Sequence, residues 1–147
     1  MVELLEVQEP VMRLQRDLRQ AAATLSAREA RYLVDGYYLI QEMRKRAANQ
    51  IRAMSEDKEP HSLVTWVYER MVMLEGSIKA ALGEYSQGNP VGRWAESITG
   101  IGPVISAGLL AHIDMSQAPT VGHIWRFAGL DPTDTWAKGE KRPWNAD

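Results

Sequence analysis

The sequence predicts an all-α protein, with a long helical hairpin or bundle followed by a compact helix-hairpin-helix unit. Three observations support this fold class. Apolar residues recur at spacings of three and four over residues 10–87, which is the helical period. No segment alternates apolar and polar residues for long enough to indicate a strand. A Gly-x-Gly-Pro turn at residues 100–103 leads into a stretch rich in small residues.

Three helices are expected before this turn. The first begins near Pro10, and its apolar face is marked by Val11, Leu14, Leu18, Ala22 and Leu25. The second is opened by a capping box from Ser26 to Glu29 and runs to about Met54. A polar loop at residues 55–60 precedes the third, which spans Leu63–Tyr85 and is broken by GNP at 88–90. We therefore divide the chain into a coiled-coil-like hairpin, residues 1–88, and a second domain, residues 89–147.

The apolar stripes on these helices leave the oligomeric state open. They bury one another in a monomeric hairpin or bundle, which is one reading of the pattern. A homodimer through the N-terminal helices is the alternative, because a coiled coil between two copies would bury the same faces.

The stretch ITGIGPVISAGLLA, residues 98–111, is the most informative part of the chain. Two glycines around Ile101 allow a sharp turn, and Pro103 suits the first turn of a helix. Because the first amides of a helix lack partners within it, such a turn is suited to hold a phosphate without reading bases. We therefore expect Gly100, Ile101, Gly102 and Val104 to present backbone amides to DNA, with Ile101 tucked between the two hairpin helices.

The C-terminal third of the chain resembles a known transposase domain. Its GIGP turn, the run AGLLAHI, and a later AGLDP followed by a Gly/Lys/Arg-rich segment occur in the family's order and spacing. These features are similar to the C-terminal helix-hairpin-helix domain of the DEDD (RuvC-like) bacterial insertion-sequence transposases. The resemblance covers residues 97–142 and implies a mobile-element or phage origin and contact with DNA.

The resemblance does not extend to the family's catalytic groups. The family's nuclease half holds divalent metal with separated acidic residues on a sheet, whereas residues 1–90 read as helices. The family's C-terminal domain also carries a serine, proposed as a nucleophile, where this chain has Ala137 beside Lys138. We therefore name no catalytic residue and favour a protein that is not an enzyme. The chain also ends where the family domain continues, which leaves open a truncation of a longer protein.

The charge pattern limits how the chain can contact nucleic acid. The formal net charge is −2, so contact with DNA must come from local basic patches rather than from bulk charge. One such patch, at Arg44 and Lys45 with Arg46 and Arg52 near them, lies on the second helix. Another, formed by Lys138, Lys141 and Arg142, lies in the C-terminal tail.

Composition excludes several other classes of site. The chain has no cysteine, which rules out disulfides and thiolate metal sites. Its histidines, His61, His112 and His123, lack ligand-like neighbours, so we expect no metal and no cofactor. No apolar run approaches the roughly 20 residues of a membrane span, and no secretory signal opens the chain. We expect a cytoplasmic protein without membrane contact.

Two functions remain in competition at this point. The first is a non-catalytic DNA-binding protein that holds the backbone of duplex or branched DNA through the GIGP hairpin. The alternative is a protein-interaction module on a repurposed helix-hairpin-helix fold, for example a phage-encoded inhibitor of a host defence system. Five tryptophans favour this alternative, because exposed tryptophan often anchors interfaces. A recombinase fragment that needs a partner nuclease chain is the third possibility. It ranks last because Ala137 stands where the related domain has its serine.

Overall fold

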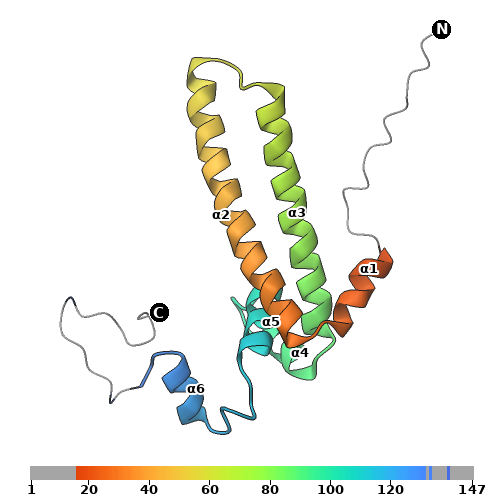
Figure 1. Ribbon diagram of the computed structural model, residues 1–147, viewed down its shortest axis with the longest axis vertical. Coiled ribbons are helices and arrows are strands. Elements are labelled where there is room, and N and C mark those ends of the chain that lie inside the picture. The colour runs from red at the N-terminus through yellow and green to blue at the C-terminus, as the bar shows by residue number, and fades with distance from the viewer. Residues whose placement is uncertain (1–15, 132, 134–138, 140–147) are drawn as a thin grey trace. The chain divides into compact units, whose positions relative to one another are not determined.

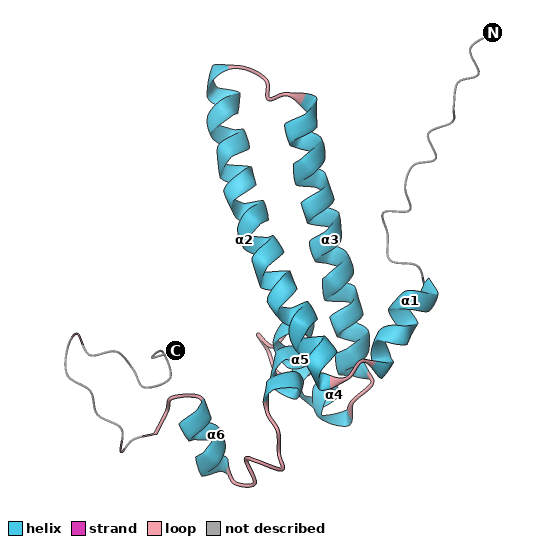
Figure 2. Ribbon diagram, viewed as in Figure 1, coloured by secondary structure: helices cyan, strands magenta, loops and turns pink. Residues whose placement is uncertain are grey.

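The protein is all-helical wherever its structure is described. The computed structural model describes residues 16–131 together with Thr133 and Gly139. This part of the chain contains α-helices, one 3-10 helix and no strand, which confirms the predicted fold class (Figure 2). None of its helices combines the length and the apolarity that crossing a bilayer requires.

Two long helices, α2 (Ala27–Asp57) and α3 (Ser62–Gln87), form an antiparallel hairpin (Figure 1). The predicted capping box begins α2: the Ser26 hydroxyl accepts from the Glu29 amide, and the Glu29 carboxylate accepts from the Ser26 amide. Both helices run slightly beyond their predicted ends. The His61 ring nitrogen accepts from the Leu63 amide and caps α3. Only residues 58–61 separate the two helices.

The helix predicted to run through Leu25 ends earlier in the structure. Its described part is α1 (Arg16–Ala21), followed by the 3-10 turn η1 (Ala22–Thr24); residues 10–15 lie outside the described part. Leu25 adopts an extended backbone, with φ −57° and ψ 139°, before the N-cap of α2. The chain has to reverse direction here, because α2 starts only a few residues later and packs against the same helix, α3.

Two short helices, α4 (Pro90–Glu96) and α5 (Pro103–His112), pack at the end of the hairpin where α2 begins and α3 ends (Figure 1). Val34 and Tyr37 of α2, Leu82 of α3, and Val104 and Ala107 of α5 form one buried cluster. The Arg31 Nε of α2 donates to the Ala111 carbonyl over 2.6 Å. The positive guanidinium thus stabilises the C-terminal end of the α5 dipole. The stretch rich in small residues after the turn forms α5, and its buried members Ser106, Ala107 and Ala111 allow close packing on the hairpin.

The contact between α3, α4 and α5 depends on a buried polar junction. The hydroxyls of Ser86 and Ser106, both fully buried, lie 2.7 Å apart, and Ser106 also donates to the Gly92 carbonyl over 3.2 Å. Gly92 lies so close to α3 that a Cβ would stand 2.1 Å from the Ser86 carbonyl oxygen. Each buried hydroxyl thus has a partner, as burial requires.

The chain separates into two compact units, which divide after His112. The domain boundary that we placed at 88/89 falls within the first unit, since α5 contributes to the core of the hairpin. The second unit contains one described helix, α6 (Val121–Phe127). Gly129, with φ 71°, ends α6 in a left-handed conformation, and the Leu130 amide returns to the Trp125 carbonyl over 2.8 Å. This C-cap explains the AGL part of the AGLDP motif.

Candidate nucleic-acid interface

The turn between α4 and α5 begins as a series of tight backbone bonds. The amides of Ser97, Ile98 and Ile101 donate to carbonyls three residues earlier, over 3.0–3.1 Å. Gly100 then takes φ +94°, a conformation that L side chains rarely adopt, so glycine is needed there. Gly102 has no positive φ, and a Cβ on it would meet nothing within 4 Å. A Cβ on Gly100 would also meet nothing within 4 Å, so the two glycines of the motif differ only in their backbone conformation: Gly100 requires glycine, whereas Gly102 tolerates a side chain within the fold.

The four predicted phosphate-binding residues separate into different roles. Ile101 is half-buried, and its amide donates to the Ile98 carbonyl over 3.0 Å. We expected this amide to bind a phosphate, but in the structure it already has an acceptor. The first bond of α5 runs from the Ser106 amide to the Gly102 carbonyl. The amides of Gly100, Gly102 and Val104 precede it and have no acceptor among the described residues. Val104 also buries its side chain in the core cluster.

The surroundings of this turn are apolar rather than basic. No Lys or Arg occurs in the sequence between Arg93 and Arg126, while Glu96 and Asp114 do. Exposed apolar side chains are instead contributed by α4, by the turn and by α5: Val91, Trp94, Ile98, Ile105 and Leu109. Trp94 is 65% exposed. A phosphate at this turn would therefore be held by amides and the helix dipole, without a cationic side chain from residues 94–125.

Arg44, a predicted DNA contact, is engaged inside the hairpin. Its guanidinium pairs with both carboxylate oxygens of Glu75 on α3, one of them at 3.3 Å, and the Glu75 side chain is only 13% exposed. Gln41 donates to the same carboxylate over 3.3 Å and to the Tyr37 hydroxyl over 3.2 Å. These hydrogen bonds, above all the one from Arg44, hold the pKa of Glu75 below its ordinary value. The sequence analysis did not predict this network. The available signal was that Arg44 and Glu75 carry opposite charges and lie beside the apolar faces of two neighbouring predicted helices.

Lys45, the next residue, lies on the exposed surface of α2. Its ammonium is 3.2 Å from the Glu42 carboxylate, and both side chains are more than half exposed. An exposed pair of this kind is weak, so Lys45 can exchange Glu42 for another anion at little cost. The structure therefore leaves Lys45 accessible and places Arg44 in an ion pair across the hairpin.

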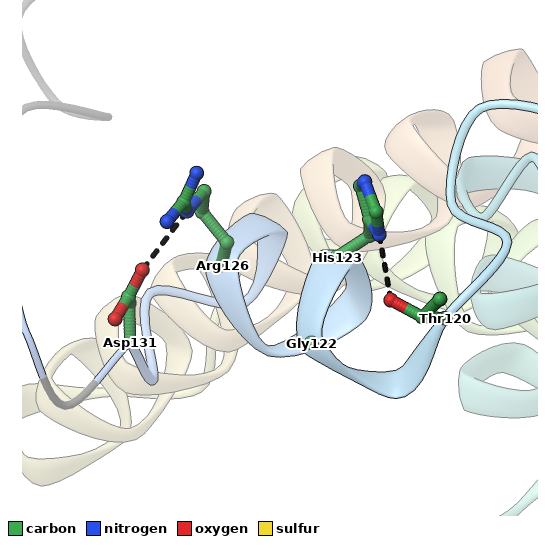
Figure 3. Close-up of a pocket in the computed structure, with 5 residues that line it drawn as sticks. All are labelled: Thr120, Gly122, His123, Arg126 and Asp131. Atoms are coloured by element: carbon green, nitrogen blue, oxygen red, sulfur yellow. Dashed lines mark hydrogen bonds and ion pairs between the residues drawn. The ribbon is translucent and has the colours of Figure 1, made fainter.

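The second unit has a polar hollow of about 320 Å³ beside α6 (Figure 3). Thr120 and His123 meet at 2.7 Å between the hydroxyl and Nδ1, and Arg126 pairs with Asp131 at 2.9 Å. Asp131 also accepts from the hydroxyl and the amide of Thr133, and these bonds lower its pKa to about 2. Asp131 therefore caps a backbone amide of this turn, as aspartate commonly does.

The remaining predicted residues lie outside the described part of the chain. They are the tail cations Lys138, Lys141 and Arg142, together with Ala137, the position of the family's serine. Among the described residues, no three acidic or histidine side chains gather in a way that could hold a metal ion.

These features describe a class of protein: a helical protein with a glycine–proline turn between two short helices, followed by a glycine-capped helix. Residues 92–142 match the Transposase IS116/IS110/IS902 family. The match agrees with the resemblance deduced from residues 97–142 and begins at Gly92, in α4. It covers the C-terminal third of the chain and includes α5, α6 and the turn that precedes each. No curated protein and no solved structure matches the chain.

Proposed function

We propose that this chain is a non-catalytic DNA-binding protein of mobile-element or phage origin, acting in the cytoplasm. It grips the phosphate backbone of duplex or branched DNA through the turn before α5. The observation that carries this proposal is the set of amides at Gly100, Gly102 and Val104, which lack acceptors among the described residues in a segment matching a transposase family. The open space at Gly102 allows a phosphate oxygen to approach the backbone closely.

Gly102→Ala is the direct test, because the added Cβ has room in the fold but would occupy the space of the ligand. We expect at least a tenfold loss of affinity for duplex DNA, with an unchanged unfolding midpoint. Gly76→Ala is the matched control, since its Cβ also meets nothing within 4 Å but lies on α3, away from the turn. Equal DNA affinity of all three proteins would show that the turn is only a connector.

The tail cations are the second part of the proposed DNA contact. We expect Lys138, Lys141 and Arg142 to contact phosphates, and Lys45 to add a weaker contact. Replacing the three tail cations by Gln should weaken binding to all sequences alike and flatten the slope of log K against log salt by up to about three units. An unchanged slope would place the tail away from nucleic acid. Titrations with duplex, single-stranded and four-way-junction DNA would identify the preferred form.

A protein-interaction module is the second candidate function, for example an inhibitor of a host defence system. The exposed apolar side chains of α4 and α5, with Trp94 the most exposed among them, favour it, as does the absence of cations from residues 94–125. The salt titrations above separate the two candidates. Absence of binding to every DNA form at low salt would leave the interaction module as the function.

A homodimer through the hairpin is part of the proposal. Tyr32, Leu39 and Met43 repeat at spacings of seven and four along α2 and are 77%, 65% and 47% exposed, so they form an apolar stripe on one face of the helix. Leu39→Glu should convert the dimer to a monomer in sedimentation equilibrium. A wild-type chain that sediments as a monomer at micromolar concentration would refute this part.

A further inference from the structure

The hairpin of α2 and α3 has a core only at its base, the end where α4 and α5 pack. Its buried side chains are Ala30, Val34 and Tyr37 on α2 and Ala81, Leu82 and Ser86 on α3. Between residues 38 and 80, none of the described side chains is buried. Because a helix in a protein is stabilised mainly by the packing of its apolar face, most of the hairpin lacks that support in a single chain.

Each long helix carries a second apolar stripe beside the one that faces its neighbour. The α2 stripe consists of Leu33, Gly36, Ile40, Met43, Ala47 and Met54, and the α3 stripe consists of Leu63, Val67, Leu74 and Ala81. Their members are three, four or seven positions apart, so each stripe follows one side of its helix. Both stripes open onto the same face of the hairpin, because Leu33, Leu74 and Ala81 line one apolar groove of about 320 Å³. A helix with one neighbour needs one stripe, whereas a helix in a four-helix bundle packs against two neighbours.

Arg70 falls within the α3 stripe, between Val67 and Leu74. Its guanidinium lies 5.1 Å from the centroid of the Trp66 ring, which is half exposed. The Arg70 Nε is covered and has no acceptor among the described residues, so a single chain leaves a donor unpaired here. Tryptophan and arginine are the residues that most often anchor an interface, which favours a protein partner for this face.

The groove at the base is left open by the described part of the chain. Leu18 of α1 lines it, but α1 contacts only η1 and α3, and Leu18 and Leu74 are 62% and 51% exposed. Met54 and Leu63, 45% and 60% exposed, lie at the tip of the hairpin, the opposite end from α4 and α5 (Figure 1). Leu33 and Met54 are 21 positions apart, about 32 Å along α2, so a chain cannot place its own tip in its own groove.

We propose that two copies pair face to face and antiparallel as a four-helix bundle, in which Met54 and Leu63 at the tip of one hairpin fill the groove at the base of the other. In this pairing Leu33 lies opposite Met54 of the second copy, and Met43 lies near its own counterpart at the twofold axis. Leu74 is nearly level with Met43, because Arg44 and Glu75 pair across the hairpin, so it also lies near the axis. One face thus complements itself, as a twofold interface requires.

The size of the face and the position of α1 favour this arrangement. The face is about 32 Å long and about 20 Å wide, or about 600 Å² in projection, if each helix is about 10 Å across. This is close to the roughly 800 Å² of accessible surface that each partner buries in a stable interface. Parallel copies would set the two grooves and the two α1 helices against each other, without a tip to fill either groove. The inference rests on the homodimer of the proposed function and is independent of DNA binding.

Leu74→Glu tests the surface. We expect it to raise the dissociation constant of the dimer at least a hundredfold in sedimentation equilibrium, because it places a carboxylate near the axis. Val72→Glu is the matched control, since Val72 is 42% exposed and lies on the opposite side of α3. Circular dichroism should show equal helicity for both variants. A dimer that Leu39→Glu dissociates and Leu74→Glu does not would overturn this inference and leave the homodimer standing, whereas a monomeric wild type would refute both.

Crosslinking tests the orientation in the full chain, which has no natural cysteine. A chain with Leu33→Cys is mixed with a chain with Met54→Cys and treated with a short bismaleimide. The mixture should give at least ten times more crosslinked dimer than either chain alone, because like cysteines lie about 32 Å apart in the antiparallel bundle. Crosslinking of Leu33→Cys chains to one another would indicate parallel copies, and equal yields from the mixture and the single chains would show that the tip does not enter the groove. Either result would overturn the proposal.

Discussion

Gly92 of α4 lies close to the backbone of α3 at Ser86. A Cβ on Gly92 would stand 2.1 Å from the Ser86 carbonyl oxygen and 2.8 Å from the Ser86 hydroxyl, so Gly92→Ala must push the two helices apart. This shift would also strain the bond from Ser106 to the Gly92 carbonyl. We expect Gly92→Ala to lower the free energy of unfolding by about 2 kcal/mol, as overpacking does. Urea denaturation followed by circular dichroism measures this change.

Gly76→Ala is again the control, because glycine-to-alanine substitution in an open helical position should raise the free energy of unfolding by roughly 0.5–1 kcal/mol. If Gly92→Ala proved as stable as the wild type, the close packing of α4 on α3 would be wrong. The close approach of Gly92 could not be predicted from the segment VGRW, because its neighbour, Ser86, belongs to another helix.

Glu75 makes the stability of the hairpin depend on pH. Hydrogen bonding from Arg44 and Gln41 lowers its pKa in the folded chain from the ordinary value of 4.5. Its stabilising contribution is therefore fully present above pH 4.5 and is lost as the pH falls through the lower folded pKa. We expect Glu75→Gln to destabilise the chain near neutral pH, and we expect this difference from the wild type to shrink as the pH falls below 4.5. Thermal melts of both proteins across this range test the sign; a pH-independent difference would contradict it.

At the scale of helices, local signals predicted starts better than ends. The capping box located the beginning of α2 because Ser26 and Glu29 satisfy each other's amides without help from the rest of the fold. The end of α1 could not be predicted in this way. The apolar face continues through Ala22 to Leu25, and the helix stops because the chain must turn to pair α2 with α3. Such a stop depends on tertiary packing, which periodicity does not contain.

The capping box also makes a prediction at this scale. Ser26→Ala removes the acceptor for the Glu29 amide and should lower the free energy of unfolding by about 1 kcal/mol. Ser55→Ala, near the other end of the same helix, removes only a bond to the Ile51 carbonyl and should change stability much less. Chemical denaturation of both variants gives the comparison. Equal losses would mean that the N-terminus of α2 is held by packing rather than by its cap.

For the molecule as a whole, some parts of the candidate nucleic-acid interface could be predicted from the sequence, and others depend on packing between helices. The Gly-x-Gly-Pro turn at residues 100–103 and the C-terminal resemblance could be recognised from the sequence, because glycine, proline and their spacing act locally. It did not separate the roles of Gly100, Ile101 and Gly102, which depend on backbone angles and on one hydrogen bond. It also could not show that Arg44 pairs with Glu75, because these two residues lie on different helices and are 31 positions apart in the sequence. The basic cluster on α2 therefore offers DNA less charge than its sequence indicates.

The chain alone should neither cut DNA nor transfer strands. Metal-assisted cleavage needs carboxylates that converge on an ion, and a covalent intermediate needs a hydroxyl nucleophile with a group that activates it. Ala137 stands where the related domain has its serine, and Asp131 is held by Thr133 and Arg126. We expect supercoiled and four-way-junction DNA to stay intact with the purified chain and either Mg²⁺ or Mn²⁺. Asp131 and Asp134 are the close acidic pair in the sequence at the AGLDP motif, so cleavage that Asp131→Asn or Asp134→Asn abolishes would overturn this prediction. Cleavage unaffected by both substitutions should persist in mock preparations from cells without the gene, which would assign it to a contaminating nuclease.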